Sequence, residues 1–135
     1  MNFQQAIQSG FSNYTNFRGR ASRSEFWWFQ LFVLLGEVAA ALVDASGNFT
    51  MLDGSPLVTL FWLATLIPDL AVMARRLHDT DSSGWWLLLM LIPFIGIVAL
   101  IVWWCLEGSK GDNQFGADPL QPALTRLTAS SRANR

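Results

Sequence analysis

The stretch that decides the fold runs from Arg75 to Leu106. It reads RRLHDTDSSG (residues 75–84) and continues as WWLLLMLIPFIGIVALIVWWCL (residues 85–106), a run without a charged residue. A helix over this run rises roughly 33 Å, and the hydrocarbon core of a bilayer is about 30 Å thick. Tryptophan pairs stand at its two ends, at 85–86 and 103–104, as in the aromatic belts of a membrane span. The stretch therefore predicts a transmembrane helix.

The rest of the composition also indicates a membrane protein. Of the 135 residues, 52% are hydrophobic and 14% are charged, whereas ordinary soluble domains are about 25% charged. Two more apolar runs, at residues 26–43 and 57–74, are long enough to span. The first begins too late for a signal peptide, so we expect it to remain in the protein. We predict an all-α integral membrane helical bundle with three transmembrane helices in a single domain over 1–120, and a disordered tail at 121–135.

The N-terminal residues predict a further, amphipathic helix. Residues 2–17 carry no charged side chain, and large apolar side chains recur at helical spacing at Phe3, Ile7, Phe11, Tyr14 and Phe17. Such a helix either lies in the membrane interface or packs its apolar face on the protein itself. We favour the interface. The capping-box spacing of Ser22 and Glu25 then places the start of the first span near residues 21–23.

The distribution of arginine predicts the orientation in the membrane. Arginines lie just before the first apolar run and just after the second, while the loop at 44–56 has no Lys or Arg. The positive-inside rule then places the N-terminus in the cytoplasm. Three spans leave the C-terminus outside. If the third run instead folds back near Pro93–Gly96, the C-terminus returns to the cytoplasmic side, and the sequence does not decide between the two.

Two carboxylates lie inside the predicted spans, Glu37 and Asp69. Each costs about 2.5–3.5 kcal/mol at the bilayer centre on the insertion scale, so each should face protein or water. One hypothesis is a small transporter or channel component that uses both. The other is structural: Glu37 is protonated and hydrogen-bonded within an oligomer, and Asp69 pairs with a cytoplasmic Arg. We favour the structural hypothesis because their depths differ by roughly 8 Å. Gly36 and Ala40 form a small-residue pair typical of contacts between membrane helices.

The sequence offers no motif for catalysis, a cofactor or a metal. His78 is the only histidine, with Asp79 and Asp81 nearby, and a metal site needs several convergent ligands. Cys105 is the only cysteine and has no base close to it in sequence. We find no phosphate-binding glycine loop and no nucleophile motif. We therefore expect no enzyme, no cofactor, no metal and no nucleic-acid partner.

Three motifs together carry a family resemblance. They are FRGRASRSEFW (17–27), RRLHD with SGWW (75–79 and 83–86), and PFIG with GDNQFGADP (93–96 and 111–119). In this order they resemble domain-of-unknown-function family 805, the small bacterial inner-membrane proteins of the YhaH and YhaI type. Gln114 stands where the family pattern has Arg, and Glu37 and Asp69 are not part of that pattern. The resemblance implies a bacterial inner (plasma) membrane location and a small helical bundle, and it implies no activity.

The charged residues of the first two motifs are the candidate site. They fall at the cytoplasmic edge in the predicted topology, where Arg–carboxylate pairs such as Glu25 with Arg75 or Arg76 would form a clasp between helices. The clasp also offers a site for a lipid headgroup or a partner. Its candidate members are Arg18, Arg20, Arg23, Glu25, Arg75, Arg76, His78 and Asp79. The leading hypothesis is a non-enzymatic multi-pass protein of the lipid bilayer that acts through self-association as a homo-oligomer, or through a membrane-protein or lipid partner.

Overall fold

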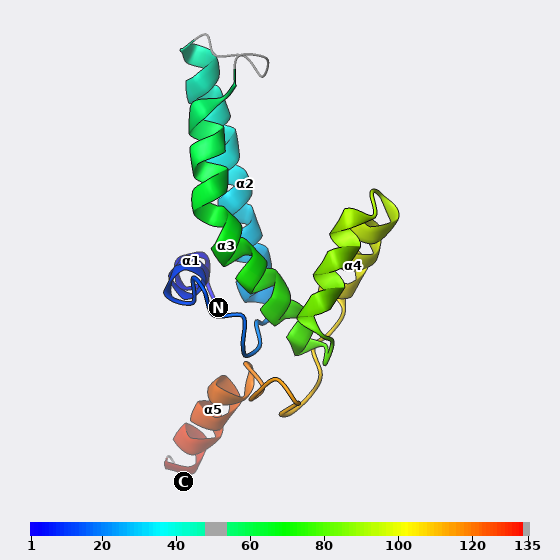
Figure 1. Cartoon of the computed structure of the whole chain (residues 1–135). Coiled ribbons are helices and arrows are strands. Elements are labelled where there is room, and N and C mark those ends of the chain that lie inside the picture. Colours follow the sequence, from blue (N-terminus) through cyan, green and yellow to red (C-terminus); the bar gives the residue numbers. More distant parts are fainter. Residues whose placement is uncertain (48–53, 134–135) are drawn as a thin grey trace. The chain divides into compact units, whose positions relative to one another are not determined.

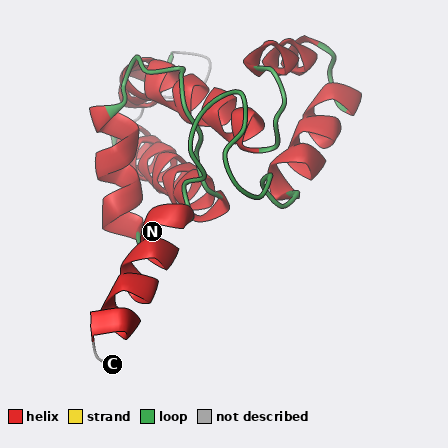
Figure 2. Cartoon of the chain, turned by 90° about the horizontal axis from the view of Figure 1, so that it is seen from below, coloured by secondary structure: helices red, strands yellow, loops and turns green. Residues whose placement is uncertain are grey.

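The computed structural model describes residues 1–47 and 54–133. Its helices are α1 (Phe3–Ser12), α2 (Arg23–Ser46), α3 (Pro56–Asp79), the 3-10 helix η1 (Gly84–Leu91), α4 (Ile95–Cys105) and α5 (Gln121–Ala133) (Figures 1 and 2). The only strand-like pairing in these ranges is a bridge between Asn113 and Gly116. The all-α prediction is confirmed. Residues 48–53 of the predicted loop and residues 134–135 of the predicted tail lie outside the described residues.

The chain divides into two compact units, where the sequence predicts a single domain. The first unit holds Met1–Asn16 and Ser24–Val72, and the second holds Phe17–Arg23 and Met73–Arg135. Within the described residues, α2 and α3 are the helices long and apolar enough to cross a membrane. At 24 residues each, they rise about 36 Å.

The first unit is built on the pairing of α2 with α3, which lie side by side in both views (Figures 1 and 2). Gly36 lies so close to the Phe61 ring that a Cβ at this position would collide with it. The rings of Phe32 and Phe61 also meet, with centroids 6.0 Å apart. Gly36 therefore serves a close contact between two helices of the same chain, the kind of contact that its small-residue pair with Ala40 predicts.

Helix α1 packs its apolar face against other helices of the first unit. The Phe11 ring meets the Phe29 ring with centroids 5.9 Å apart. Gly10 also lies against Phe29, which leaves no room for a Cβ. Tyr14 donates its hydroxyl hydrogen to the main-chain oxygen of Ala64 at 2.8 Å. These contacts support packing on the protein, the alternative to the favoured interfacial placement, although Phe11 and Tyr14 remain 38% and 37% exposed.

Asp44 ties the C-terminal end of α2 to the start of α3. Its buried carboxylate accepts the main-chain N–H groups of Leu57 and Val58, each at 3.1 Å. The first N–H groups of a helix have no partner within the helix, and a side-chain acceptor satisfies them. Asp44 is therefore the N-terminal cap of α3, supplied from the neighbouring helix.

We expect Asp44→Ala to lower the free energy of unfolding by about 0.5–2 kcal/mol, the usual effect of losing a helix cap. Asp44→Asn keeps an acceptor and should lose less. The measurement is thermal unfolding in detergent, followed by circular dichroism. Ser46→Ala is the matched control, because Ser46 is exposed and, among the described residues, its hydroxyl bonds the main-chain oxygen of Val43 in its own helix. Equal melting temperatures for Asp44→Ala and Ser46→Ala would contradict the capping role.

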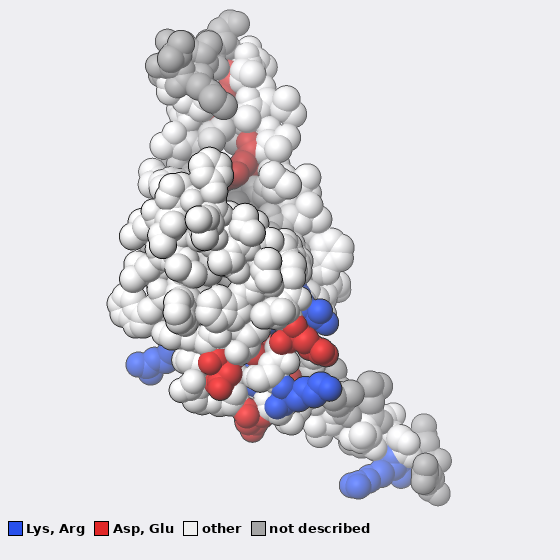
Figure 3. Space-filling view, turned by 90° about the vertical axis from the view of Figure 1, so that its right-hand side faces the viewer, with Lys and Arg blue, Asp and Glu red and all other residues white. Residues whose placement is uncertain are grey.

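The apolar run at 85–106 is not one continuous helix, as the predicted third span would require. The run forms the antiparallel pair η1 and α4, joined by a turn at Ile92–Phe94. The Trp86 and Trp103 rings, expected at opposite interfaces, lie together with centroids 5.3 Å apart. We call this pair the hairpin. The surface it turns to the viewer in Figure 3 shows no charged side chain.

Three residues explain why the chain turns back. Pro93 has no N–H group and interrupts the helix. Phe94 adopts a positive φ of 64° with ψ of −67°, and the Ile95 N–H bonds the Pro93 oxygen at 2.8 Å, which together make a γ-turn. Gly96 then lies so close to η1 that a Cβ would collide with the main-chain oxygen of Leu89.

The segment after residue 120 also differs from the sequence prediction. Where the sequence predicts disorder, Gln121–Ala133 forms α5. The residues of this segment include Leu, Ala, Arg and Gln, which favour a helix once it is nucleated. The segment carries none of the candidate site residues.

Candidate functional site

Residues from each of the three motifs meet in the second unit around Asp79, the last residue of α3, while Pro93–Gly96 of the third motif lies at the turn of the hairpin. One carboxylate oxygen of Asp79 accepts a hydrogen bond from Nε of Arg20 at 3.0 Å, and the other accepts one from Nη1 of Arg76. Arg76 is fully buried, and Asp79 and Arg20 are 4% and 8% exposed. Burying charges is costly unless they are paired and hydrogen-bonded. Here one carboxylate neutralises part of the charge of two guanidinium groups.

Other guanidinium N–H groups of the two arginines bind main-chain oxygens at the end of the hairpin and just after it. Arg20 donates to the oxygens of Ser109 and Gly111, each at 2.5 Å. Arg76 donates to the Trp104 oxygen at 3.1 Å and to the Leu106 oxygen. The last carbonyl groups of a helix have no partner within the helix, so Arg76 caps the end of α4. The two arginines thus hold the chain that leaves the hairpin against the end of α3.

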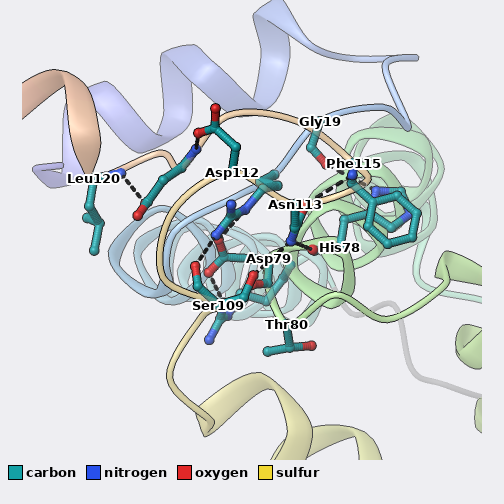
Figure 4. Close-up of polar contacts among 12 residues, drawn as sticks. Gly19, His78, Asp79, Thr80, Ser109, Asp112, Asn113, Phe115 and Leu120 are labelled. Carbon is teal, nitrogen blue, oxygen red and sulfur yellow. Dashed lines mark hydrogen bonds and ion pairs between the residues drawn. The ribbon is translucent and has the colours of Figure 1, made fainter.

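His78 is held between the first and third motifs (Figure 4). Its Nδ1 lies 3.0 Å from the main-chain oxygen of Gly19. A carbonyl oxygen only accepts, so Nδ1 carries the hydrogen. The imidazole stacks on the Phe115 ring with centroids 4.1 Å apart and planes 3° apart. Asn113 donates to the His78 main-chain oxygen at 2.8 Å. His78 is therefore a contact point for both motifs.

Residues 108–118, which include most of the third motif, form a loop that is hydrogen-bonded to itself and packs against Asp79. The Gly111 N–H bonds a carboxylate oxygen of Asp118 at 3.0 Å. Ser109 donates its N–H to the main-chain oxygen of Asp79 at 2.7 Å. Gly108 approaches Asp79 so closely that a Cβ would collide with the carboxylate. We call Arg20, Arg76, His78 and Asp79 together with residues 108–118 the motif cluster.

The structure brings together some of the predicted site residues and not others. Arg20, Arg76, His78 and Asp79 form the centre of the motif cluster. Arg75 is buried and contributes its main-chain oxygen, which accepts the Ala21 N–H at 3.0 Å. Arg18 and Arg23 are exposed. Glu25 belongs to the first unit, where its carboxylate accepts the Ser9 hydroxyl at 2.7 Å.

Sequence reasoning missed the residues of the loop at 108–118 as members of the site. Ser109, Asn113, Phe115 and Asp118 all make the contacts described above, yet none was a candidate. The available signal was the density of Gly, Asn and Asp in this motif, because such residues favour turns through their own backbone and side-chain geometry. Sequence reasoning interpreted that signal as a turn but did not predict which part of the protein the turn would contact.

The two carboxylates inside the predicted spans lie in the first unit and differ in their hydrogen bonding. Asp69 accepts a hydrogen bond from the side-chain amide of Gln30 at 2.5 Å, which joins α3 to α2. This partner is an amide, where the sequence suggested an Arg. Glu37 is half-buried on α2, and none of the described residues forms a hydrogen bond or an ion pair with its carboxylate. Thr65 bonds only within its own helix, to the Phe61 and Trp62 oxygens.

Known proteins are similar to this chain in sequence. A family model described as "Protein of unknown function (DUF805)" matches residues 14–117. The chain belongs to the DUF805 family. Inner membrane protein YhaI of Escherichia coli strain K12 is 44% identical over 107 residues, which cover 79% of this chain and 88% of YhaI. Inner membrane protein YhaH of the same strain is 45% identical over 112 residues, with 82% and 93% covered. No solved structure matches.

A more distant relative is the uncharacterized protein YiiR of Escherichia coli strain K12, which is 27% identical across 76% of this chain and 85% of YiiR. The names of YhaI and YhaH as inner membrane proteins, together with the two long apolar helices, fit a bacterial inner-membrane location for this DUF805 chain. They name no activity.

In this DUF805 protein the motif cluster is a closed structure. Its central carboxylate and the two guanidinium groups are used by one another and by main-chain oxygens. Across residues 1–47 and 54–133, no three His, Cys, Asp or Glu side chains are grouped to hold a metal ion. Cys105 is exposed. The arrangement can hold chain segments together, and within residues 108–118 it exposes the side chains of Lys110, Asp112 and Gln114.

Proposed function

We propose that this DUF805 protein is not an enzyme and that it acts by associating with a second copy of itself in the inner membrane. Two features of the chain support this. The charged side chains at the centre of the motif cluster are buried and engaged within the second unit. The arginines that flank the apolar helices support a cytoplasmic N-terminus by the positive-inside rule. The motif cluster then serves as a clasp that stabilises the fold.

Glu37 is the observation that carries self-association. It lies within an apolar helix and forms no hydrogen bond or ion pair with the described residues, and the exposed residues Leu34 and Ala41 stand one turn to either side. A carboxyl group in hydrocarbon is costly unless another polar group meets it. In a symmetric dimer the same patch meets itself, so two protonated Glu37 carboxyl groups would donate to and accept from each other.

We expect Glu37→Leu to abolish self-association and Glu37→Gln, which keeps a donor and an acceptor, to preserve it. The measurement is energy transfer between donor-labelled and acceptor-labelled copies in liposomes while the lipid-to-protein ratio is raised. Associated copies keep their transfer efficiency on dilution, whereas separate copies lose it. Transfer in the unaltered protein no greater than random mixing gives would refute the proposal.

A transporter or channel component is the second candidate function. Gln30 and Glu37 are seven residues apart and so share a face of α2, and Gln30 contacts Asp69, which gives a series of polar groups between the two long helices. The same variants separate the candidates. A proton or cation path predicts that Glu37→Gln abolishes a pH-dependent flux into liposomes while energy transfer persists. Self-association alone predicts no flux in any variant.

A further inference from the structure

Each arm of the hairpin is too short to cross a bilayer, and its length matches the thickness of one leaflet. Helix α4 has 11 residues and rises about 16 Å at 1.5 Å per residue. The 3-10 helix η1 has 8 residues and rises about 16 Å at 2.0 Å per residue. The hydrocarbon core is about 30 Å thick. Both arms therefore reach the depth of one leaflet.

The surface of the hairpin carries no charged side chain, and its tip is highly exposed. No charged residue occurs between Trp85 and Leu106, and the surface that faces the viewer in Figure 3 is correspondingly uncharged. At the turn, Leu91, Phe94 and Ile95 are 79%, 83% and 77% exposed. A helix that is hydrophobic on every side belongs inside a protein or a membrane. The tip in particular has no polar side chain to meet water.

The backbone of the turn is also suited to hydrocarbon, where an unpaired N–H group costs several kcal/mol. The N–H groups of Ile92, Ile95 and Gly96 bond the main-chain oxygens of Leu89, Pro93 and Ile92 at 2.8–3.1 Å. Pro93 has no N–H group to satisfy. The turn therefore reverses the chain with few exposed backbone donors.

Both ends of the hairpin are fixed at one surface. Its first arm follows α3 after the short loop at 80–83, and its second arm ends where Arg76 binds the Trp104 and Leu106 oxygens. The polar motif cluster lies at this base, and the apolar tip lies at the other end of the arms. The hairpin thus changes from a charged base to an apolar tip, just as one leaflet changes from charged headgroups to apolar acyl chains.

We propose that the hairpin is a re-entrant element that inserts into one leaflet, with the acyl chains of that leaflet as its partner, and that it enters and leaves the bilayer on the side of the motif cluster. Two helices, α2 and α3, then span the membrane, and the C-terminal segment lies on the same side as the arginines of the first two motifs. The inference is independent of the role of Glu37.

Sidedness is the first test. Single cysteines are placed at either end of the hairpin by Ser82→Cys and Lys110→Cys, in a Cys105→Ser background. A membrane-impermeant maleimide is applied to spheroplasts and to inverted inner-membrane vesicles. We expect both positions to react only in inverted vesicles. Reaction of one position in spheroplasts and of the other in inverted vesicles would mean that the run crosses the bilayer, and would overturn the proposal.

Depth is the second test, and it separates insertion from lying on the surface. A spin label at Phe94→Cys in liposomes should meet oxygen readily and a water-soluble nickel chelate hardly at all, at a depth of about 15 Å. The label at Lys110→Cys should show the reverse. A label at position 94 that the nickel chelate reaches as easily as position 110 would place the tip outside the hydrocarbon, and would equally overturn the proposal.

Discussion

Replacing Asp79 by Ala is expected to lower the free energy of unfolding by about 3–5 kcal/mol, the usual effect of removing one partner from a buried ion pair. Two guanidinium groups, of Arg20 and Arg76, would lose their shared carboxylate while remaining buried. Unfolding by sodium dodecyl sulfate in mixed micelles, followed by tryptophan fluorescence, measures the loss. The third motif should also loosen, so that trypsin cleaves faster after Lys110.

Two variants make the Asp79 experiment specific. Asp79→Asn keeps the shape and one acceptor but removes the charge, so its loss should be intermediate. Glu107→Ala removes an exposed carboxylate from the same unit and should change neither unfolding nor cleavage. If Asp79→Ala behaved like Glu107→Ala, the motif cluster would not be a clasp.

The spanning helices were the predictable part of the fold. The apolar runs at 26–43 and 57–74 fall inside α2 and α3, and the capping signal near residues 21–23 matches the start of α2 at Arg23. Such runs are predictable because a bilayer demands length, low charge and internal backbone hydrogen bonds at once. Few other structures satisfy all three demands.

The hairpin was not predictable from apolar length alone. A run from 85 to 106 has the length of a span whether it crosses or turns back. Pro93 and Gly96 were visible in the sequence, but membrane helices tolerate both residues. The outcome depends on how closely Gly96 approaches the Leu89 oxygen, a contact between two arms that no periodicity reports. The possibility of turning back was open in the sequence, and the structure shows that turn.

The candidate site was predictable in its members and less so in its pairing. The first two motifs supplied Arg20, Arg76, His78 and Asp79, because they lie beside apolar runs, where Arg–carboxylate pairs at the membrane edge are expected. The partner of Arg20 lies 59 residues away, and sequence spacing cannot choose between Glu25 and Asp79 over such a distance. The arginine contacts to main-chain oxygens have no sequence signal, since every residue carries the same acceptor.

Replacing Gly96 by Ala is expected to open the hairpin and to lower the free energy of unfolding by about 1–3 kcal/mol, the range for overpacked sites. The new methyl group would collide with the main-chain oxygen of Leu89, and relief requires the two arms to separate. Spin labels in place of Trp86 and Trp103, whose rings are 5.3 Å apart, report the separation. A straight helix would hold the two positions about 26 Å apart.

The direction of the change at Gly96 distinguishes a collision from a general effect of added bulk. Ala99→Val adds volume to the same helix at an exposed position, so it should leave both the label distance and the unfolding curve unchanged. Gly96→Ala should lengthen the distance, because Pro93 and the γ-turn at Phe94 bend the chain but do not by themselves hold the arms in contact. A short distance that survives in Gly96→Ala would mean that the turn alone closes the hairpin and that the glycine contact is incidental.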